Sequence, residues 1–211
     1  MKRIDWTFYL VADTAFRRGR DFLQAIEDAV EGGVTAIQIR GKNIEGGDLF
    51  TLASTAASLL EPHGIPLIIN DRADVARACS AAGVHLGRDD LPIEAARKIL
   101  GPDAVIGLSV NTIDEAREAE RLGADYVGLG PVFATTTKDT PLPVLGPEGV
   151  ARVKAAVGIP VIAIGGLNAA NVAAIMQAGA DGAAVISAVW GAPDVRTAAQ
   201  EFLAAIRTSQ P

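Results

Sequence analysis

Residues 160–187 read PVIAIGGLNAANVAAIMQAGADGAAVIS, and they hold one complete repeat of the chain's organisation. The apolar run Val161–Ile164 follows a proline, which is typical of the start of a strand. Asn171–Ala178 has apolar residues at spacings of three and four, as in a helix. Gly179 comes next, where glycine commonly caps a helix end, and a second apolar run follows at Ala183–Ile186. The segment therefore predicts a strand, a helix and another strand.

The same alternation of apolar runs and Ala-rich helical segments extends over the whole chain. Six more runs are predicted to be strands: Phe8–Ala12, Ala36–Ile39, Pro66–Ile69, Gly83–Leu86, Val105–Leu108 and Tyr126–Leu129. Further helical stretches include Phe22–Glu31, Asp48–Leu60 and Ile113–Leu122. Strands that are apolar almost throughout indicate a parallel sheet covered by helices on both faces. Eight strand-helix units predict an α/β fold, a closed (β/α)8 TIM barrel, with an open doubly wound sheet as the alternative.

Length, charge and cysteine content narrow the class of protein. The chain has 211 residues and no Pro/Ser-rich or charged break, so we expect a single domain over residues 1–211. A formal net charge of −6 disfavours nucleic-acid and anionic-membrane partners, which require a basic surface. Cys79 is the only cysteine, so no intrachain disulfide can form. With no signal-peptide or membrane-spanning run in the sequence, we expect a cytoplasmic location.

In a barrel of this kind the chemistry lies in the loops that follow the strands. Gln38, Arg40 and Lys42 are spaced by two at the end of one predicted strand. Strand geometry points all three the same way, while Ile37 and Ile39 face the helices. The three polar side chains are therefore predicted to face the barrel axis. The alternative is that Arg40 and Lys42 only extend into solvent from a strand end.

Two aspartates end neighbouring strands. Asp71 and Asp90 follow the third and fourth predicted strands, and two carboxylates beside phosphate oxygens would suit Mg²⁺. Asp71 could instead pair with Arg72 or cap the helix that begins near Ala73, and taken alone this structural interpretation is favoured. One of the Asp89/Asp90 pair is expected to cap the next helix.

The loop after Tyr126–Leu129 is rich in hydrogen-bond donors. Gly130–Lys138 reads GPVFATTTK, with three hydroxyls, one ammonium and no carboxylate, which suits a phosphorylated ligand. A Thr-rich surface turn is the alternative. Gly165-Gly166 and Ile186-Ser187 follow the seventh and eighth strands, where barrel enzymes often hold phosphate on backbone N–H groups.

Two anion sites are thus predicted at one rim. The first is basic and metal-assisted, formed by Arg40, Lys42, Asn70 and Asp71. The second is neutral, formed by backbone amides and hydroxyls near Thr135, Thr137, Gly166 and Ser187. Such a pair of sites indicates two phosphorylated small-molecule substrates or one bisphosphate.

The strand ends together resemble those of a known family, thiamine-phosphate synthase, also called thiamine-phosphate pyrophosphorylase. The resemblance runs from Tyr9 to about Val189. It rests on six segments in order: QIRGK at 38–42, INDR at 69–72, GVHLGRDD at 83–90, GLS at 107–109, GPVFATTTK at 130–138 and IGGL at 164–167.

The resemblance implies a transferase of thiamine biosynthesis. It would join 4-amino-2-methyl-5-hydroxymethylpyrimidine diphosphate to 4-methyl-5-(2-hydroxyethyl)thiazole phosphate, with Mg²⁺ as cofactor, and release pyrophosphate and thiamine phosphate. The family is thought to react dissociatively, through a pyrimidine carbocation, and so needs no protein nucleophile.

Site residues carried over from the family fall into four groups. The matches that would hold pyrophosphate are Arg40, Lys42, Asn70 and Lys138. Those that would hold Mg²⁺ are Asp71 and Asp90, and those that would contact the pyrimidine are Gln38 and Ser109. Those that would hold the thiazole phosphate are Thr135, Thr137, Gly166, Ile186 and Ser187. The residues expected to act in catalysis are Lys138, Arg40, Lys42 and Ser109.

Some positions depart from the family pattern. Arg88 stands where Gln is expected, Asn111 where relatives often carry His or Lys, and Ala12 where Thr is common. One alternative is the thiazole tautomerase branch, an isomerase that relies on a His at the position of Asn111. A phosphosugar isomerase or epimerase barrel, or a non-catalytic thiamine-phosphate sensor, are more distant alternatives. His85 is interpreted as a satisfied strand residue, and the sequence leaves monomer or homo-oligomer open.

Overall fold

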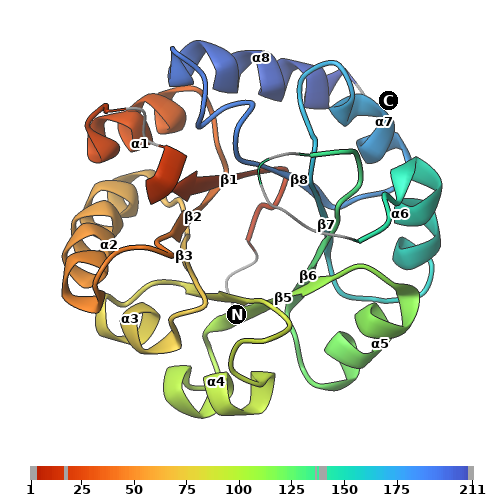
Figure 1. Cartoon of the computed structure of the whole chain (residues 1–211), viewed down its shortest axis with the longest axis horizontal. Helices are drawn as coiled ribbons and strands as arrows, with labels where there is room; N and C mark the ends of the chain where they lie inside the picture. Colours follow the sequence, from red (N-terminus) through yellow and green to blue (C-terminus); the bar gives the residue numbers. More distant parts are fainter. Residues whose placement is uncertain (1–3, 17–18, 136, 138–141, 209–211) are drawn as a thin grey trace.

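The computed structural model describes residues 4–16, 19–135, 137 and 142–208. Eight parallel strands form a closed barrel in sequence order, with the helices around it (Figure 1). The strands are β1 (Phe8–Asp13), β2 (Ala36–Arg40), β3 (Leu67–Asn70), β4 (Gly83–Leu86), β5 (Val105–Val110), β6 (Tyr126–Leu129), β7 (Val161–Ile164) and β8 (Gly182–Val185). The predicted TIM barrel is confirmed. Pairing of Phe8 with Ala183 between β1 and β8 closes the sheet and rules out the open alternative.

An α-helix follows each strand. These are α1 (Phe22–Glu31), α2 (Gly46–Leu60), α3 (Ala73–Ala78), α4 (Ile93–Leu100), α5 (Ile113–Arg121), α6 (Gly146–Lys154), α7 (Val172–Gln177) and α8 (Val195–Arg207). Short 3-10 helices η1 (Thr14–Phe16) and η2 (Glu61–His63) follow β1 and α2. No helix in the described part of the chain is long and apolar enough to cross a membrane.

Local chemistry explains where the elements begin and end. Every predicted strand or helix named above is present, with ends shifted by at most two residues. Pro66 stays outside β3 because it has no N–H to give, although its carbonyl accepts from Ile37. Ile186 leaves β8 because its carbonyl accepts from the N–H of Trp190, 2.7 Å away, in a tight turn. At Gly179 φ is +95°, the left-handed conformation expected of a glycine after a helix.

The barrel has an outer and an inner core. Residues such as Ile37 and Ile39 pack outward against the helices. The inner core fills the barrel itself and consists of Trp6, Tyr9, Ala36, Ile68, Val105, Tyr126, Ile162 and Ala184. Alternation along each strand produces this division, because successive side chains point to opposite faces. The Trp6 ring lies 4.3 Å from that of Tyr126, centre to centre, in this inner core.

Two glycines make room for rings inside the barrel. A Cβ on Gly107 would lie 2.5 Å from the hydroxyl oxygen of Tyr126. A Cβ on Gly128 would lie 2.8 Å from Cε1 of His85. Both distances are far below van der Waals contact, so any larger residue in β5 or β6 at these positions would displace a ring.

Candidate active site

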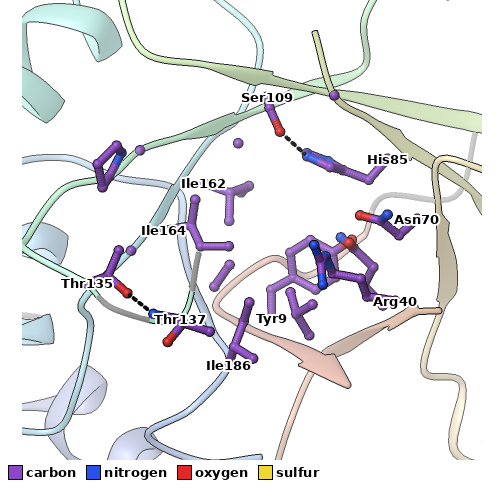
Figure 2. Close-up of a pocket in the computed structure, with 18 of the residues that line it drawn as sticks. Tyr9, Arg40, Asn70, His85, Ser109, Thr135, Thr137, Ile162, Ile164 and Ile186 are labelled. Carbon is purple, nitrogen blue, oxygen red and sulfur yellow. Dashed lines mark hydrogen bonds between the residues drawn. The ribbon is translucent and has the colours of Figure 1, made fainter. Parts of the chain in front are cut away.

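A cavity of about 540 Å³ opens at the carboxyl ends of the strands. The predicted site residues that line it are Gln38, Arg40, Lys42, Asn70, Asp90, Ser109, Thr135, Thr137, Gly166, Ile186 and Ser187. Figure 2 shows Thr135, Thr137 and Ile186 across the cavity from Arg40 and Asn70. Asp71 does not line the cavity but contacts Lys42, which does. Lys138 lies outside the described residues.

Arg40 is held in place by a carboxylate that the sequence analysis did not single out. Asp13 ends β1 and pairs in register with Arg40 at the end of β2. Its side chain is only 2% exposed and forms an ion pair with the Arg40 guanidinium. The N–H of Ala15 also donates to this carboxylate, at 2.9 Å. The main-chain carbonyl of Asp13 accepts from the indole of the fully buried Trp190, at 2.9 Å.

Lys42, Asp71 and Asp90 form a cluster of mixed charge. The Lys42 Nζ lies 2.5 Å from Asp71 Oδ2, and Asp90 accepts the N–H of Gly87 at 2.7 Å. Burial raises the pKa of Asp71, the Asp90 carboxyl adds to this effect, and Lys42 opposes it. Burial also acts to raise the pKa of Asp90, but hydrogen bonds with Asp71 and Gly87 and the nearby Lys42 charge act against it, and on balance that pKa is lowered. Because the carboxyls of Asp71 and Asp90 repel each other when both are charged, the pair is stabilised by a proton or a cation that both can bind.

Asp71 and Asp90 are accordingly the residues that could hold a divalent cation. Among the described residues, no group of three or more His, Cys, Asp or Glu side chains comes together as a metal site. A cation here would therefore take its remaining oxygens from water and a bound phosphate. Mg²⁺ accepts this kind of site, because it usually keeps several waters and uses one or two carboxylates.

The structure contradicts two structural roles considered above, namely that Asp71 pairs with Arg72 or caps α3, and that Asp89 or Asp90 caps α4. Arg72, not Asp71, precedes α3, and its side chain makes no cap hydrogen bond. Arg72 pairs instead with Asp74, at 2.6 Å. Pro92, which has no polar side-chain atom, occupies the cap position of α4 in place of Asp89 or Asp90, and the Asp90 carboxylate instead accepts the N–H of Gly87. Asp71 has φ of +62°, a left-handed conformation that is costly for a residue with a side chain.

Hydroxyls and glycines gather on the opposite side of the cavity. The Thr137 hydroxyl donates to Ser187 Oγ at 3.0 Å, and the Thr137 N–H donates to Thr135 Oγ1 at 3.2 Å. The loop after β6 lies against the loop after β7, since the N–H of Phe133 donates to the Gly165 carbonyl at 3.0 Å. Gly166 has φ of +66°, and a Cβ there would lie 2.8 Å from Phe133 Cβ. Only glycine fits this close approach.

Arg88 and Asn111, which depart from the family pattern, meet at Glu115. Arg88 lines the cavity and pairs with Glu115 at 2.7 Å. The other Glu115 oxygen accepts the N–H of Asn111 at 2.6 Å. The Asn111 amide donates to the carbonyls of Gly130 and Pro143, at 3.0 and 3.2 Å, and Asn111 is not among the lining residues. Asn111 therefore holds loops together rather than facing a ligand.

Three aromatic residues missed as site residues lie on the cavity floor. Tyr9, His85 and Tyr126 all line the cavity and are hydrogen-bonded to one another or to predicted site residues. Both tyrosines of the chain are within strands, at positions that alternate with outward apolar residues. That alternation was the available signal, but it does not separate a functional ring from a filler of the barrel interior.

A closed (β/α)8 barrel with polar groups of both charges around a cavity at its carboxyl end is the architecture of an enzyme for small molecules. Comparison with known proteins identifies the family. The family model described as thiamine monophosphate synthase matches residues 8–189. The thiamine-phosphate synthase of Azorhizobium caulinodans is 48% identical over 206 residues, which cover 98% of this chain and 97% of that protein. The corresponding enzyme of Syntrophomonas wolfei is 46% identical over 202 residues, 96% of this chain and 97% of that one.

A solved structure agrees. Thiamine phosphate pyrophosphorylase from Pyrococcus furiosus superposes with a TM-score of 0.89 and 39% identity, and 98% of each chain is covered. The chain belongs to the thiamine-phosphate synthase family, which confirms the resemblance described above. It is a transferase of thiamine biosynthesis that acts on small molecules.

Proposed function

We propose that the chain condenses 4-amino-2-methyl-5-hydroxymethylpyrimidine diphosphate with 4-methyl-5-(2-hydroxyethyl)thiazole phosphate, by a Mg²⁺-assisted dissociative reaction. The observation that carries the proposal is the division of one cavity into two unlike halves. Arg40, Lys42 and Asn70 line the half beside Asp71 and Asp90, whereas Thr137 and Ser187 line the half with hydroxyls. This division suits one diphosphate and one monophosphate, bound face to face.

The basic half suits the leaving group. When the C–O bond to the diphosphate breaks, its electron pair stays on the pyrophosphate oxygen, and negative charge builds there. Arg40, Lys42 and Lys138 would stabilise that charge, with Arg40 already oriented by Asp13. Mg²⁺, when held by Asp71 and Asp90, would supply further positive charge to the same oxygens.

The neutral half suits the acceptor substrate. Thr135, Thr137, Ser187 and the backbone at Gly166 and Ile186 would hold the thiazole phosphate and direct its ring nitrogen toward the pyrimidine. The lone pair of that nitrogen then forms the new C–N bond. Gln38 and Ser109 would hold the pyrimidine between the two halves. Fixing two substrates in line removes much of the entropic cost of a bimolecular step.

The tautomerase alternative finds no support in the site. That reaction relies on a histidine at position 111, and the residue here is an asparagine whose amide is bonded to Gly130 and Pro143. A tautomerase also needs no pyrophosphate site, which would leave the Lys42–Asp71–Asp90 cluster unexplained. The same cluster argues against a non-catalytic sensor.

The test is release of pyrophosphate by the purified protein. With both substrates and Mg²⁺, we expect one pyrophosphate for each thiamine phosphate formed. Leaving out either substrate should abolish the release. Pyrophosphate formation no faster than that without protein would contradict the proposal, and thiazole isomerisation without pyrophosphate release would favour the tautomerase.

A further inference from the structure

Five side chains from five strands form one continuous hydrogen-bonded chain across the floor of the cavity. Gln38 Nε2 donates to the Tyr9 hydroxyl at 2.8 Å, and the hydroxyls of Tyr9 and Tyr126 are 3.0 Å apart. Tyr126 reaches His85 Nδ1 at 2.9 Å, and His85 Nε2 reaches Ser109 Oγ at 2.9 Å. Figure 2 shows the last of these bonds, between β4 and β5. The two ends of the chain are the two residues assigned to the pyrimidine.

We propose that this chain is a directed relay, in which Tyr9, Tyr126 and His85 are positioning residues that keep the Ser109 hydroxyl as a hydrogen-bond donor into the cavity. The assignment rests on the geometry of the five side chains, and its use in recognition rests on the proposed function.

The direction follows from counting protons. A phenol has one proton to donate. Because Tyr9 accepts from Gln38, its own proton goes to Tyr126, and the Tyr126 proton then goes to His85 Nδ1. His85 is thereby held as the neutral tautomer with its proton on Nε2, which donates to Ser109. The Ser109 proton is left to point at a ligand.

The surroundings keep the relay intact. Tyr9 and Tyr126 are 2% and 0% exposed, and burial raises the pKa of both phenols well above the ordinary value, so both keep their protons. The space for Tyr126 and His85 comes from Gly107 and Gly128, as described above. The rings therefore rest against bare main chain, which leaves them little room to turn away from their partners.

The relay gives the two ends opposite hydrogen-bonding character. With Nε2 of Gln38 facing Tyr9, its Oε1 remains an acceptor, whereas Ser109 presents a donor. An aminopyrimidine carries an amino group that donates and ring nitrogens that accept, so its edges complement these ends. If the Gln38 amide were turned over, Oε1 would accept from Tyr9 and the donor and acceptor of each later hydrogen bond would be exchanged. Ser109 would then donate to His85 Nε2 and have no proton for the ligand. Recognition of the aminopyrimidine by Gln38 and Ser109 therefore depends on which nitrogen of His85 carries the proton.

The tautomer can be read directly by ¹⁵N NMR. The chain has two histidines, so in the His63→Gln variant the only imidazole ¹⁵N signals come from His85. His63 is in η2, outside the cavity. At neutral pH and without ligand, we expect a neutral imidazole with the proton on Nε2. In the His63→Gln/Tyr126→Phe protein, Nδ1 loses its donor and a mixture of both tautomers should appear. A proton on Nδ1, an imidazolium, or an unchanged tautomer after Tyr126→Phe would each overturn the relay.

Kinetics then test the link to Ser109. Tyr9→Phe removes one oxygen two side chains away from His85, and we expect KM for the pyrimidine diphosphate to rise about fivefold, with KM for the thiazole phosphate unchanged. In Ser109→Ala/Tyr9→Phe the losses should be less than multiplicative, because the relay no longer has an end to position. Multiplicative losses would reduce Tyr9 to a packing residue and overturn the proposal. If the parent protein releases no pyrophosphate, the proposed function fails, while the NMR result still decides the relay.

Discussion

The ammonium of Lys42, which lines the basic half of the cavity, lies 2.5 Å from the carboxylate of Asp71, which lies behind it. Asp90 adds a second carboxyl whose presence helps to raise the pKa of Asp71. Lys42 thus already supplies Asp71 with the positive charge that a metal ion would supply. A cation that binds the two aspartates has to compete with Lys42, which would then be released toward the diphosphate.

Asp71→Asn should weaken the dependence on Mg²⁺. The amide keeps the shape but loses the charge, so we expect the Mg²⁺ concentration for half-maximal activity to rise about tenfold or more. The measurement is a Mg²⁺ titration of pyrophosphate release. Asp74→Asn is the matched control, since Asp74 is exposed and pairs only with Arg72 among the contacts described. Identical titrations for the parent and the Asp71 variant would remove Asp71 from the metal site.

Lys138→Ala should depress kcat by about 100-fold, because Lys138 is assigned to the charge that develops on pyrophosphate. Single-turnover rates at saturating substrate would separate this effect from product release. Lys98→Ala removes an exposed lysine paired with Glu94 on α4 and should leave kcat unchanged. An unaltered kcat in the Lys138 variant would exclude that role.

Asp13→Asn should affect only the diphosphate. Without its charged partner, Arg40 is less well oriented, and we expect KM for the pyrimidine diphosphate to rise about tenfold. KM for the thiazole phosphate should not change. Ser187→Ala should show the opposite pattern, since Ser187 bonds to Thr137 in the other half. Equal changes in both KM values for either variant would contradict the division of the cavity.

Gly107→Ala should destabilise the fold by about 1–3 kcal/mol, because the new methyl group overlaps Tyr126. Gly47→Ala is the control, since a Cβ there meets nothing within 4 Å and lies in the first turn of α2. It should raise stability by about 0.4–1 kcal/mol. Urea unfolding of both variants gives the comparison. Equal stability of the two would mean that Tyr126 can move aside without cost.

The fold was predictable because its signal is local and repeated. An apolar run, a helix of matching periodicity and a glycine or proline at the boundary recur along the chain, and closure follows from the number of units. The exact first and last residues of the strands and helices were harder to predict from the sequence. Leaving β8 at Val185, for example, depends on the turn in which Trp190 donates to Ile186, a contact that no sequence pattern announces.

The site was predictable where function places polar residues at strand ends. Gln38, Arg40 and Lys42 were expected to face the cavity because of their spacing, and all three line it. Asp13 could not be assigned in the same way. Its importance comes from register, since the β1–β2 ladder sets it beside Arg40. Likewise His85 was expected to be a satisfied strand residue, and its partners Tyr126 and Ser109 are distant in sequence.

Asp13 also ends β1, the strand that closes the barrel by pairing with β8. Its side chain pairs with Arg40, and its carbonyl accepts from Trp190, which ends the turn that begins at Ile186 and includes Ser187. One residue therefore connects the two anion sites mechanically. The position of Arg40 relative to the turn that holds Ser187 therefore depends on the end of β1, the strand that closes the sheet. Circular permutation that opens the barrel at β1 should consequently disturb substrate alignment more than an opening made elsewhere.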